Sequence, residues 1–599
     1  MKKNAKMKKL LAMILTIAIS TIGVAQNVYY VSTSGNDSNS GLSEADAWRT
    51  FSYAASAASP VSAGDTVYIK AGDYGYDDIF IDKNYTAGAA RISFIGYQNV
   101  PGDIADFDFT YGDNADPTLM PLINPGDRNI GEGINLSDIY SITIKNIQIA
   151  NSLAGINIWN SASINSNHVL ENIFLQNIGW EYSTAIAIKE GDGNEISNCL
   201  IVNATGAGMD IWGNDNHIEN CKVYSNESQL TPDGTYTSMD YYIVIKGNSN
   251  LIENCYGERD GDLEDVGHGF EIKESGQNNL LLNCTVKNMI GGCFSVRWEG
   301  VRNNEFRNCH AIGGVSDDVS AFMVREGANH NTFNSCTSEN CQAGIRFILA
   351  GEDADICGYG NSFNNCIIQD AKWAIDLNPY YYNSAPVNDN KIVNCLIDDA
   401  DYLFNCERPN TGNQLLNCII THVSSLTAGG NTLDFEYLYS DFFDNGFGML
   451  SGSGNISGDP LFVDASSGDY HLQEISPCID SGTSQDAPST DFDGNSRPVG
   501  NGWDMGPYEY SGPVSTHSPS DFADGIFMYP NPTSNKITLS AHGADLSELR
   551  VYDLFGRDIT KWTRKSMPDE TSVVLDLTDL PDGTYLVKTE AGVVRVCKE

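Results

Sequence analysis

An asparagine followed by a cysteine recurs along the middle of the chain, and this repeat limits the fold more than any other feature. The pair is spaced regularly at eight positions, and Ser335-Cys336 fills the one gap in the series. Asn146-Ile147 and Asn172-Ile173 extend it to eleven repeats, with steps of 22 to 34 residues. The eight asparagines are Asn198, Asn220, Asn254, Asn283, Asn308, Asn365, Asn394 and Asn417. A repeat of this length is typical of a solenoid in which each repeat forms one coil.

Short segments before these pairs, such as AIAIK, YIVIK, GFEIK and CFSVR, alternate between apolar and other residues. This period of two indicates β-strands and excludes a helical repeat. We therefore predict an all-β fold, a right-handed parallel β-helix of eleven or more coils, with neighbouring coils about 4.8 Å apart. The repeated asparagines would form a hydrogen-bonded ladder at one bend. The cysteines would stack as small buried side chains, mostly as free thiols, because their Cβ atoms point along one another.

Both ends of the chain differ from the repeat region. Residues 1–25 have the lysine-rich start, apolar run and small-residue cleavage site of a secretory signal peptide. The stretch that opens NVYYVSTSGNDS resembles the start of secreted β-helix enzymes, and this resemblance implies an amphipathic helix at 50–58 that caps the first coil. Such a cap is needed because an open end leaves backbone groups unpaired. We place the β-helix at 26–510, a linker at 511–522 and a separate C-terminal domain at 523–599.

Two sets of terminal motifs carry resemblances to exported proteins. The C-terminal motifs YPNP, VYDLFGR and LPDGTYLV resemble the sorting domain of proteins exported by the type IX secretion system of Bacteroidetes. That resemblance implies a small β-sandwich, the type IX secretion machinery as a partner, and release or attachment at the cell surface. The opening stretch from NVYYVSTSGNDS and the segment DYHLQEISPCIDSGT are similar to the first and closing coils of secreted β-helix enzymes.

The strand alignment predicts a column of cations along one outer face. Alternate residues of each strand are apolar and should face inward, so the residues between them should face solvent. The aligned outward positions read Lys189, Trp212, Lys246, Lys273, Arg297 and Arg325, and a neighbouring outward column contains Asp210, Glu271 and Arg346. Five of the first six positions are basic, although Lys and Arg make up only 35 of 599 residues. Cations this close repel one another, so the column favours an anionic occupant.

The formal charge of −43 opposes nucleic acid or an anionic membrane surface as a partner. A local row of cations beside aromatic side chains instead favours an acidic polysaccharide, either uronate-containing or sulfated. Substrate-binding candidates are Lys189, Lys246, Arg325, Arg346, Trp212, Trp298, Tyr242 and His268. The plainer interpretation is a solvated face whose cations are balanced by nearby acids. We expect an exported monomer with no organic cofactor and no membrane-spanning segment after the signal peptide.

Two reaction classes fit such a column. We favour β-elimination, in which Lys273 removes the C5 proton of a uronate and Arg297 neutralises its carboxylate or assists the leaving oxygen. The alternative is an inverting glycoside hydrolase acting on a sulfated polysaccharide such as a fucan or carrageenan. Its carboxylates would be Asp210 and Glu271, two coils and about 9.6 Å apart. A third possibility is a non-catalytic adhesin that only grips glycans.

The stretch FEIKESGQNNLLLNCTVKNMIGGCFSVRWEGVRNNEFRNC is similar to part of the chondroitinase B and alginate lyase family. In that family a lysine base is followed about one coil later by an arginine, which implies these roles for Lys273 and Arg297. The family has a histidine where this chain has Trp298, and only Glu271 matches its pair of glutamate calcium ligands. Ca²⁺ is therefore the one cofactor candidate, and its ligands are not identified by the sequence.

Overall fold

The computed structural model describes residues 26–104, 110, 112–180, 183–230, 236–261, 263–265, 267–314, 319–349, 357–377, 385–406, 408–428 and 433–511. Towards the C-terminus it describes residues 526–529, 536–541, 549–553, 557, 559–569, 572–578, 580–581, 583–589 and 592–598. The expected signal peptide, residues 1–25, lies outside the described residues. The chain divides into two compact units, Met1–Tyr510 and Ser511–Glu599, which we describe separately.

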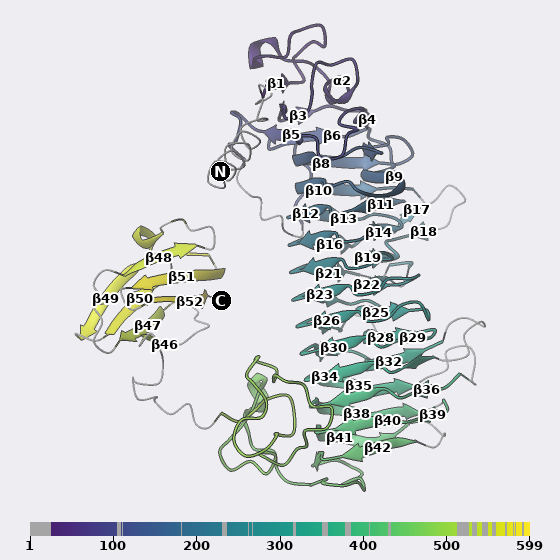
Figure 1. Ribbon diagram of the computed structural model, residues 1–599, viewed down its shortest axis with the longest axis vertical. Coiled ribbons are helices and arrows are strands. Elements are labelled where there is room, and N and C mark those ends of the chain that lie inside the picture. Colours follow the sequence, from purple (N-terminus) through teal and green to yellow (C-terminus); the bar gives the residue numbers. More distant parts are fainter. Residues whose placement is uncertain are drawn as a thin grey trace, which may run out of the picture. The chain divides into compact units, whose positions relative to one another are not determined.

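Three ladders of parallel strands stack along the first unit, which confirms the parallel β-helix (Figure 1). Within the described part of the chain the first ladder has 15 strands, more than the eleven coils counted from the repeat. They are β1 (Val28–Val31), β2 (Thr66–Lys70), β5 (Ile92–Tyr97), β8 (Ile142–Ser152), β10 (Val169–Ile178), β12 (Glu195–Ser197), β15 (His217–Glu219), β20 (Leu251–Glu253), β23 (Leu280–Leu282), β26 (Glu305–Arg307), β30 (Thr332–Asn334), β34 (Ser362–Asn364), β37 (Lys391–Val393), β40 (Asn413–Leu416) and β42 (Phe435–Leu438).

The second ladder follows the first after one bend, and β8 and β10 run through both. Its other strands are β3 (Gly72–Asp73), β6 (Pro121–Ile123), β13 (Leu200–Val202), β16 (Lys222–Ser225), β21 (Tyr256–Arg259), β24 (Thr285–Lys287), β27 (His310–Ile312), β31 (Thr337–Glu339), β35 (Ile367–Leu377), β38 (Leu396–Cys406), β41 (Ile419–Thr427) and β43 (Asp441–Phe443).

The third ladder carries the predicted cation column. Its strands are β4 (Ile79–Phe80), β7 (Ile134–Ser137), β9 (Ile156–Asn165), β11 (Thr184–Asp192), β14 (Ala207–Ile211), β19 (Tyr241–Ile245), β22 (His268–Ile272), β25 (Phe294–Arg297), β28 (Ser320–Arg325) and β32 (Ala343–Ile348), and it continues in β35, β38 and β41. Beyond it lies a short parallel ladder of β29 (Ala328–Asn329), β33 (Gly358–Tyr359), β36 (Val387–Asn388) and β39 (Asn410–Thr411). One antiparallel hairpin, β17 (Gln229–Leu230) with β18 (Tyr236–Thr237), projects from a loop.

One apolar core fills the space between the ladders, and aromatic side chains stack within it from coil to coil. The Phe306 and Phe333 rings lie 4.6 Å apart, and the Phe333 and Phe363 rings lie 4.7 Å apart. The nine stacked cysteines are likewise buried, and all 14 cysteines identified as free in the described part of the chain are buried. The expectation of mostly free thiols is therefore confirmed.

The predicted asparagine ladder is present at the bend between the first two ladders. The Asn172 side chain donates to Asn146 at 2.6 Å, and Asn308 donates to Asn283 at 3.2 Å. All of these asparagines have φ between 52° and 59°, the left-handed region that Asn tolerates better than most residues.

A second asparagine ladder, which the Asn-Cys repeat did not predict, forms more hydrogen bonds from coil to coil than the first. Asn304 illustrates it: its backbone N–H and its side-chain amide both donate to the Asn331 side chain, at 3.1 and 2.9 Å. The same pattern runs through Asn194, Asn216, Asn250, Asn279, Asn304, Asn331, Asn361 and Asn390 to Asn413, all buried. These amides satisfy backbone groups at the bend between the third and first ladders.

The first coil is capped as expected. Helix α2 (Phe51–Ala55) begins after Thr50, whose side chain accepts a hydrogen bond from the Tyr53 backbone N–H at 3.2 Å. Its Phe51 side chain packs on Phe94 inside the first coils, with ring centres 5.1 Å apart. Two short 3₁₀ helices complete the first unit, η1 (Glu44–Asp46) and η2 (Ala465–Ser467). No helix among the described residues is long and apolar enough to span a membrane.

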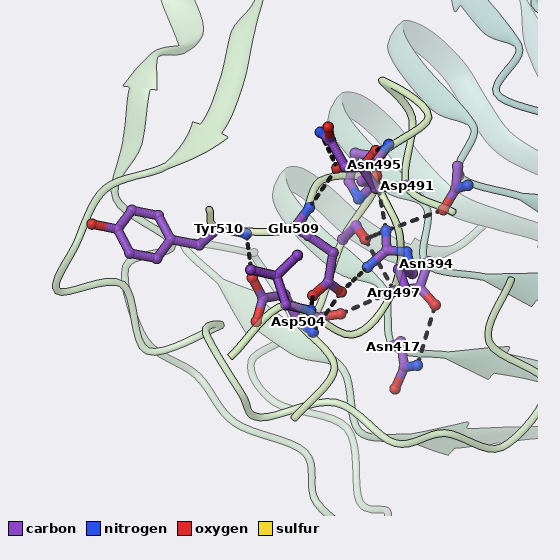
Figure 2. Close-up of polar contacts among 12 residues, drawn as sticks. Asn394, Asn417, Asp491, Asn495, Arg497, Asp504, Glu509 and Tyr510 are labelled. Atoms are coloured by element: carbon purple, nitrogen blue, oxygen red, sulfur yellow. Dashed lines mark hydrogen bonds and ion pairs between the residues drawn. The ribbon is translucent and has the colours of Figure 1, made fainter. Parts of the chain in front are cut away.

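The segment expected to form the closing coil takes a different course. It forms one antiparallel hairpin, β44 (Phe462–Asp464) with β45 (Asp469–Leu472), and packs against the outer side of the last coils. Figure 2 shows Arg497 beside Glu509, with which it forms an ion pair. Arg497 also donates to the Asn365 side chain at 3.1 Å. Asn394 donates to the Asp504 carbonyl at 2.9 Å, so this segment caps the end of the predicted asparagine ladder.

The second unit consists of two antiparallel sheets. One contains β46 (Ile526–Tyr529), β47 (Lys536–Ala541), β49 (Arg564–Asp569) and β50 (Ser572–Asp576), and the other contains β48 (Arg550–Asp553), β51 (Gly583–Thr589) and β52 (Gly592–Lys598). A 3₁₀ helix, η3 (Thr560–Trp562), lies between β48 and β49. Side chains from both sheets, including Leu539 and Val587, form one buried cluster.

Candidate functional site

The third ladder has the register that the sequence predicted. Asp210 pairs with Val244, Val244 with Glu271, and Glu271 with Ser295. In the neighbouring column Arg297 pairs with Arg325. Lys189, Lys246, Lys273, Arg297 and Arg325 therefore lie on one outer face, and we call these five residues the basic column. The column also extends one coil further than predicted, because Lys189 pairs with the exposed Trp159.

Most cations of the basic column are neutralised by a carboxylate. Lys246 contacts Asp210 at 2.8 Å, and the indole of Trp212 donates to the same carboxylate at 3.0 Å. Arg297 contacts Glu326 at 2.7 Å. Arg325 lies between Glu271 and Glu326 at 3.7 and 3.9 Å. The acids that the plainer interpretation required are therefore present beside these three residues.

Lys273 differs from these neighbours. Its ammonium lies 3.9 Å from the centre of the Tyr241 ring and 5.7 Å from that of Trp298, and no carboxylate of the described residues is within ion-pairing distance. Only 9% of its surface is exposed. Burial lowers the pKa of Lys273; Glu271 opposes this, while Lys246 and Arg297 add to it. This combination favours the neutral amine more than in an ordinary surface lysine.

Trp298 helps to form this environment through an uncommon backbone conformation. Its φ is 82°, in the left-handed region that aromatic residues rarely adopt. The ring lies 4.7 Å from the Arg297 guanidinium as well as facing Lys273. Trp298 thus joins two consecutive coils of the basic column.

Glu271 lies beneath the basic column with none of its surface exposed. It accepts a hydrogen bond from the Ser295 hydroxyl at 2.8 Å and lies 3.4 Å from His268 Nδ1. Burial would raise its pKa, but His268, Arg325 and Lys273 lower it by more. A carboxylate in this position cannot contact a substrate, so it acts on the site through its charge.

The prediction that Tyr242 binds substrate is wrong. The alternation of the strand breaks at the bend, so Tyr242 and Ile243 both point into the core, and Tyr242 is fully buried. Its neighbour Tyr241 points outward instead and pairs with His268 in the next coil, with their rings stacked at 4.9 Å. Tyr241 and the predicted residue His268 therefore form a stacked pair beside Lys273.

Arg346 is also placed differently from the prediction. It is 9% exposed, contacts the buried Asp376 at 2.7 Å and donates to Gln342 at 2.7 Å. These contacts satisfy its charge within the protein. Lys189 and Trp212 remain on the outer face, where Lys189 lies over Trp159 at 5.2 Å and Trp212 is 40% exposed.

Asp240 is a further acid beside the basic column and was not among the predicted site residues. It lies 3.9 Å from His268 Nε2, and its side chain is 28% exposed. Burial raises the pKa of Asp240; His268 and Lys273 oppose the shift, and Asp265 and Glu271 add to it. Its position directly before the outward Tyr241 is the sequence signal that could have identified it.

The described residues around Lys273 do not fit a calcium site. Asp210, Glu271 and Glu326 each face a cation of the protein, and Ca²⁺ needs several free oxygen ligands at one point. Within the described ranges, the one group of three side chains suited to a metal ion is His217, Glu219 and Glu253, on β15 and β20 of the first ladder.

Comparisons with known proteins agree with this architecture. Residues 154–317 match the family described as "Right handed beta helix region", which supports the predicted handedness. Residues 527–598 match the family described as "Secretion system C-terminal sorting domain". The chain therefore carries an export signal of the type IX kind, which indicates a protein that is released or held at the cell surface. No curated protein matches the chain.

Several solved structures are similar to the chain at low identity. Pectate lyase Pel9A is 14% identical, with 82% of this chain and 98% of that chain covered and a TM-score of 0.33. The catalytic domain of a GH87 α-1,3-glucanase is 12% identical, with 65% and 64% covered and a TM-score of 0.37. A PL6 family polysaccharide lyase from Pseudopedobacter saltans is 14% identical, with 70% and 94% covered and a TM-score of 0.36. These likenesses carry no argument about the reaction.

Proposed function

We propose that the protein degrades an acidic polysaccharide outside the cell by β-elimination, with Lys273 as the base. The observation that carries the proposal is the isolation of Lys273. It lacks a carboxylate partner among the described residues, is largely desolvated, and lies between cations on both sides. A lysine in such surroundings has a share of neutral amine that can accept a proton.

The neighbouring groups suit the remaining steps. Arg297 would face the uronate carboxylate, whose neutralisation makes the C5 proton more acidic. Lys273 would take that proton, the C5–H electrons would form the C4=C5 double bond, and the C4–O bond would break. Burial raises the pKa of Tyr241, as do Glu271 and Asp240. Its phenol therefore stays protonated at neutral pH and is a candidate to protonate the leaving oxygen.

Hydrolysis is the second candidate function, and the surroundings of Asp240 favour it. Its raised pKa and partial exposure suit a general acid. The two carboxylates that the sequence predicted for a hydrolase, Asp210 and Glu271, have less support, because Asp210 is ion-paired with Lys246 and Glu271 is buried. A hydrolase would need a different, exposed base.

Digestion of a panel of polysaccharides separates these functions. The panel would contain alginate, pectate, chondroitin, ulvan, fucoidan and carrageenan. Elimination creates one new reducing end and one conjugated double bond for each cut, so we expect ultraviolet absorbance and reducing ends to rise together. Reducing ends without absorbance would show hydrolysis instead. Binding to one of these glycans without any cleavage would show an adhesin.

A further inference from the structure

A cavity of about 340 Å³ lies beside the N-terminal half of the third ladder, at some distance from Lys273. It is formed by loops of successive coils, and its lining includes Arg128, Trp180, Thr205 and Thr237. These residues belong to the connections that lead into β7, β11, β14 and β19. The cavity therefore opens along the same row of loops that, further down the third ladder, carries Asp240 and leads into β22 at His268.

The polar groups of this cavity are incompletely bonded. Arg128 donates from Nη2 to the Asn203 carbonyl at 2.5 Å and to the Ile178 carbonyl at 3.4 Å. Among the residues that the structure describes, its Nε and Nη1 have no hydrogen-bond partner and neither does Nε1 of Trp180, and all three atoms are buried. Burial lowers the pKa of Arg128 to about 10, and the charge of Glu227 opposes the shift. Buried donors without acceptors are costly, so three of them in one cavity need an explanation.

The position of the guanidinium relates the cavity to the basic column. Ile178 ends β10 and Asn203 directly follows β13, so their carbonyls precede β11 and β14, which lie three and two coils before β22. At about 4.8 Å for each coil, Arg128 is roughly 10–14 Å from Lys273 along the axis. Thr237 of the cavity also donates to Asp265 at 2.8 Å, in the loop that leads into β22.

We propose that this cavity is a second binding site for the same glycan chain, in which Arg128 and Trp180 bind the carboxylate or sulfate group of a sugar remote from Lys273. The inference rests on the proposed function, because it assumes that an acidic polysaccharide lies along the third ladder. An anion would supply the acceptors that Nε, Nη1 and Nε1 lack, and charge-assisted hydrogen bonds to guanidinium are among the stronger ones. The polysaccharide would thus be held at two points, and the enzyme would require a minimum chain length.

Titration calorimetry with uncleaved oligosaccharides tests the site. The full chain carrying Lys273→Met would be titrated with short and long size-fractionated oligomers of alginate, oligogalacturonate and chondroitin sulfate. Adding Arg128→Met should weaken binding of the long acidic oligomers about tenfold or more and leave that of the short ones unchanged. Arg91→Met is the matched control, because Arg91 is also partly buried and donates to a backbone carbonyl, Ile142 at 3.3 Å, but precedes β5 in the first ladder.

The outcomes separate this inference from the proposed function. Equal binding of long oligomers with and without Arg128→Met overturns the second site, while cleavage by the parent protein would still support elimination. If the parent neither binds nor cleaves any member of the panel, the proposed function is overturned and the second site with it. Trp180→Phe removes the Nε1 donor and keeps an aromatic ring, so it provides the same comparison if Arg128→Met does not fold. A loss that is equal for short and long oligomers contradicts the remote position.

Discussion

Lys273 is surrounded by charges of both signs, and each changes its proton affinity in a known direction. Lys246 and Arg297 lower its pKa, and Glu271 raises it. The sequence predicted that these charged residues lie together, because strand alternation determines which residues share the outer face. The sequence did not predict which acid pairs with which cation. Glu326, the partner of Arg297, follows β28 in a left-handed conformation and so lies outside the regular alternation.

A pair of substitutions tests whether this charge environment controls the base. If neutral Lys273 removes the proton, kcat/KM rises with pH along an acid limb whose midpoint follows the pKa of Lys273. Lys246→Met removes a neighbouring cation, so the midpoint should move to higher pH. Glu271→Gln removes a neighbouring anion, so the midpoint should move to lower pH. Shifts in the same direction, or no shift in either variant, would contradict the assignment of this limb to Lys273.

The limits of sequence-based placement are clearest at Tyr242. A strict period of two correctly placed Ile243 and Ile245 in the core but failed one residue earlier, where the coil bends and both Tyr242 and Ile243 turn inward. Arg346 was placed in the correct column, but its buried partner Asp376 lies 30 residues away on β35 and could not be paired from the sequence. Burial and pairing depend on the neighbouring coils, which one coil's pattern does not contain.

Among the structural elements, the two asparagine ladders differ in the hydrogen bonds that their side chains make. Asn304 is buried, donates to Asn331 and to the Gly276 carbonyl, and accepts from Asn279. Asn308, in the ladder that the sequence revealed, is exposed and makes a single side-chain bond in each direction at most. The Asn-Cys repeat identified the weaker ladder, because the residues that follow the buried asparagines vary from coil to coil.

This difference predicts unequal effects of glycine. Asn308→Gly should change the free energy of unfolding by no more than about 0.5 kcal/mol, because glycine adopts the left-handed conformation readily. Asn304→Gly should cost about 2 kcal/mol or more, because it leaves buried backbone groups without partners. Denaturant titration of the full chain measures both. Similar losses for the two variants would show that Asn304 contributes no more to stability than Asn308.

At the scale of the whole molecule, the segment that covers the last coils contains two groups with altered proton affinity. The pKa of Asp504 is raised to about 7, and burial is the largest cause of this rise. The pKa of His471 rises to about 9 because the ring bonds to Asp493 and Asp469, although burial opposes this. In both cases the folded state holds its proton more tightly than the unfolded state, so this contribution to stability decreases as pH rises.

We therefore predict that the covering segment opens more readily at higher pH. The stability that Asp504 contributes should be lost between about pH 4 and 7, and the stability that His471 contributes should be lost between about pH 6.5 and 9. Hydrogen-exchange protection of residues 460–510, corrected for the intrinsic exchange rate, should fall across this range. Asp504→Asn should flatten the lower part of the profile, and His471→Gln the upper part. Protection that is constant or increases with pH would contradict this account.

The architecture of the first unit was the most predictable property of the molecule. Repeat length and strand alternation together predicted the parallel ladders and the register of the third ladder, and the resemblance to secreted β-helix enzymes implied the helical cap. The covering segment was expected to continue the coils, but no repeat constrains it, and its buried Arg497–Glu509 pair follows from tertiary packing.

The central claim is that Lys273 is the base, and the activity of one matched pair of variants tests it most directly. Lys287 is the control, since it is also a strand lysine but lies on β24 of the second ladder, paired with Glu258 at 2.8 Å. On the panel member that the parent cleaves, Lys273→Met should lower kcat about 10²- to 10⁴-fold with folding intact, and Lys287→Met should leave it unchanged. Full formation of unsaturated product by folded Lys273→Met protein would contradict the account.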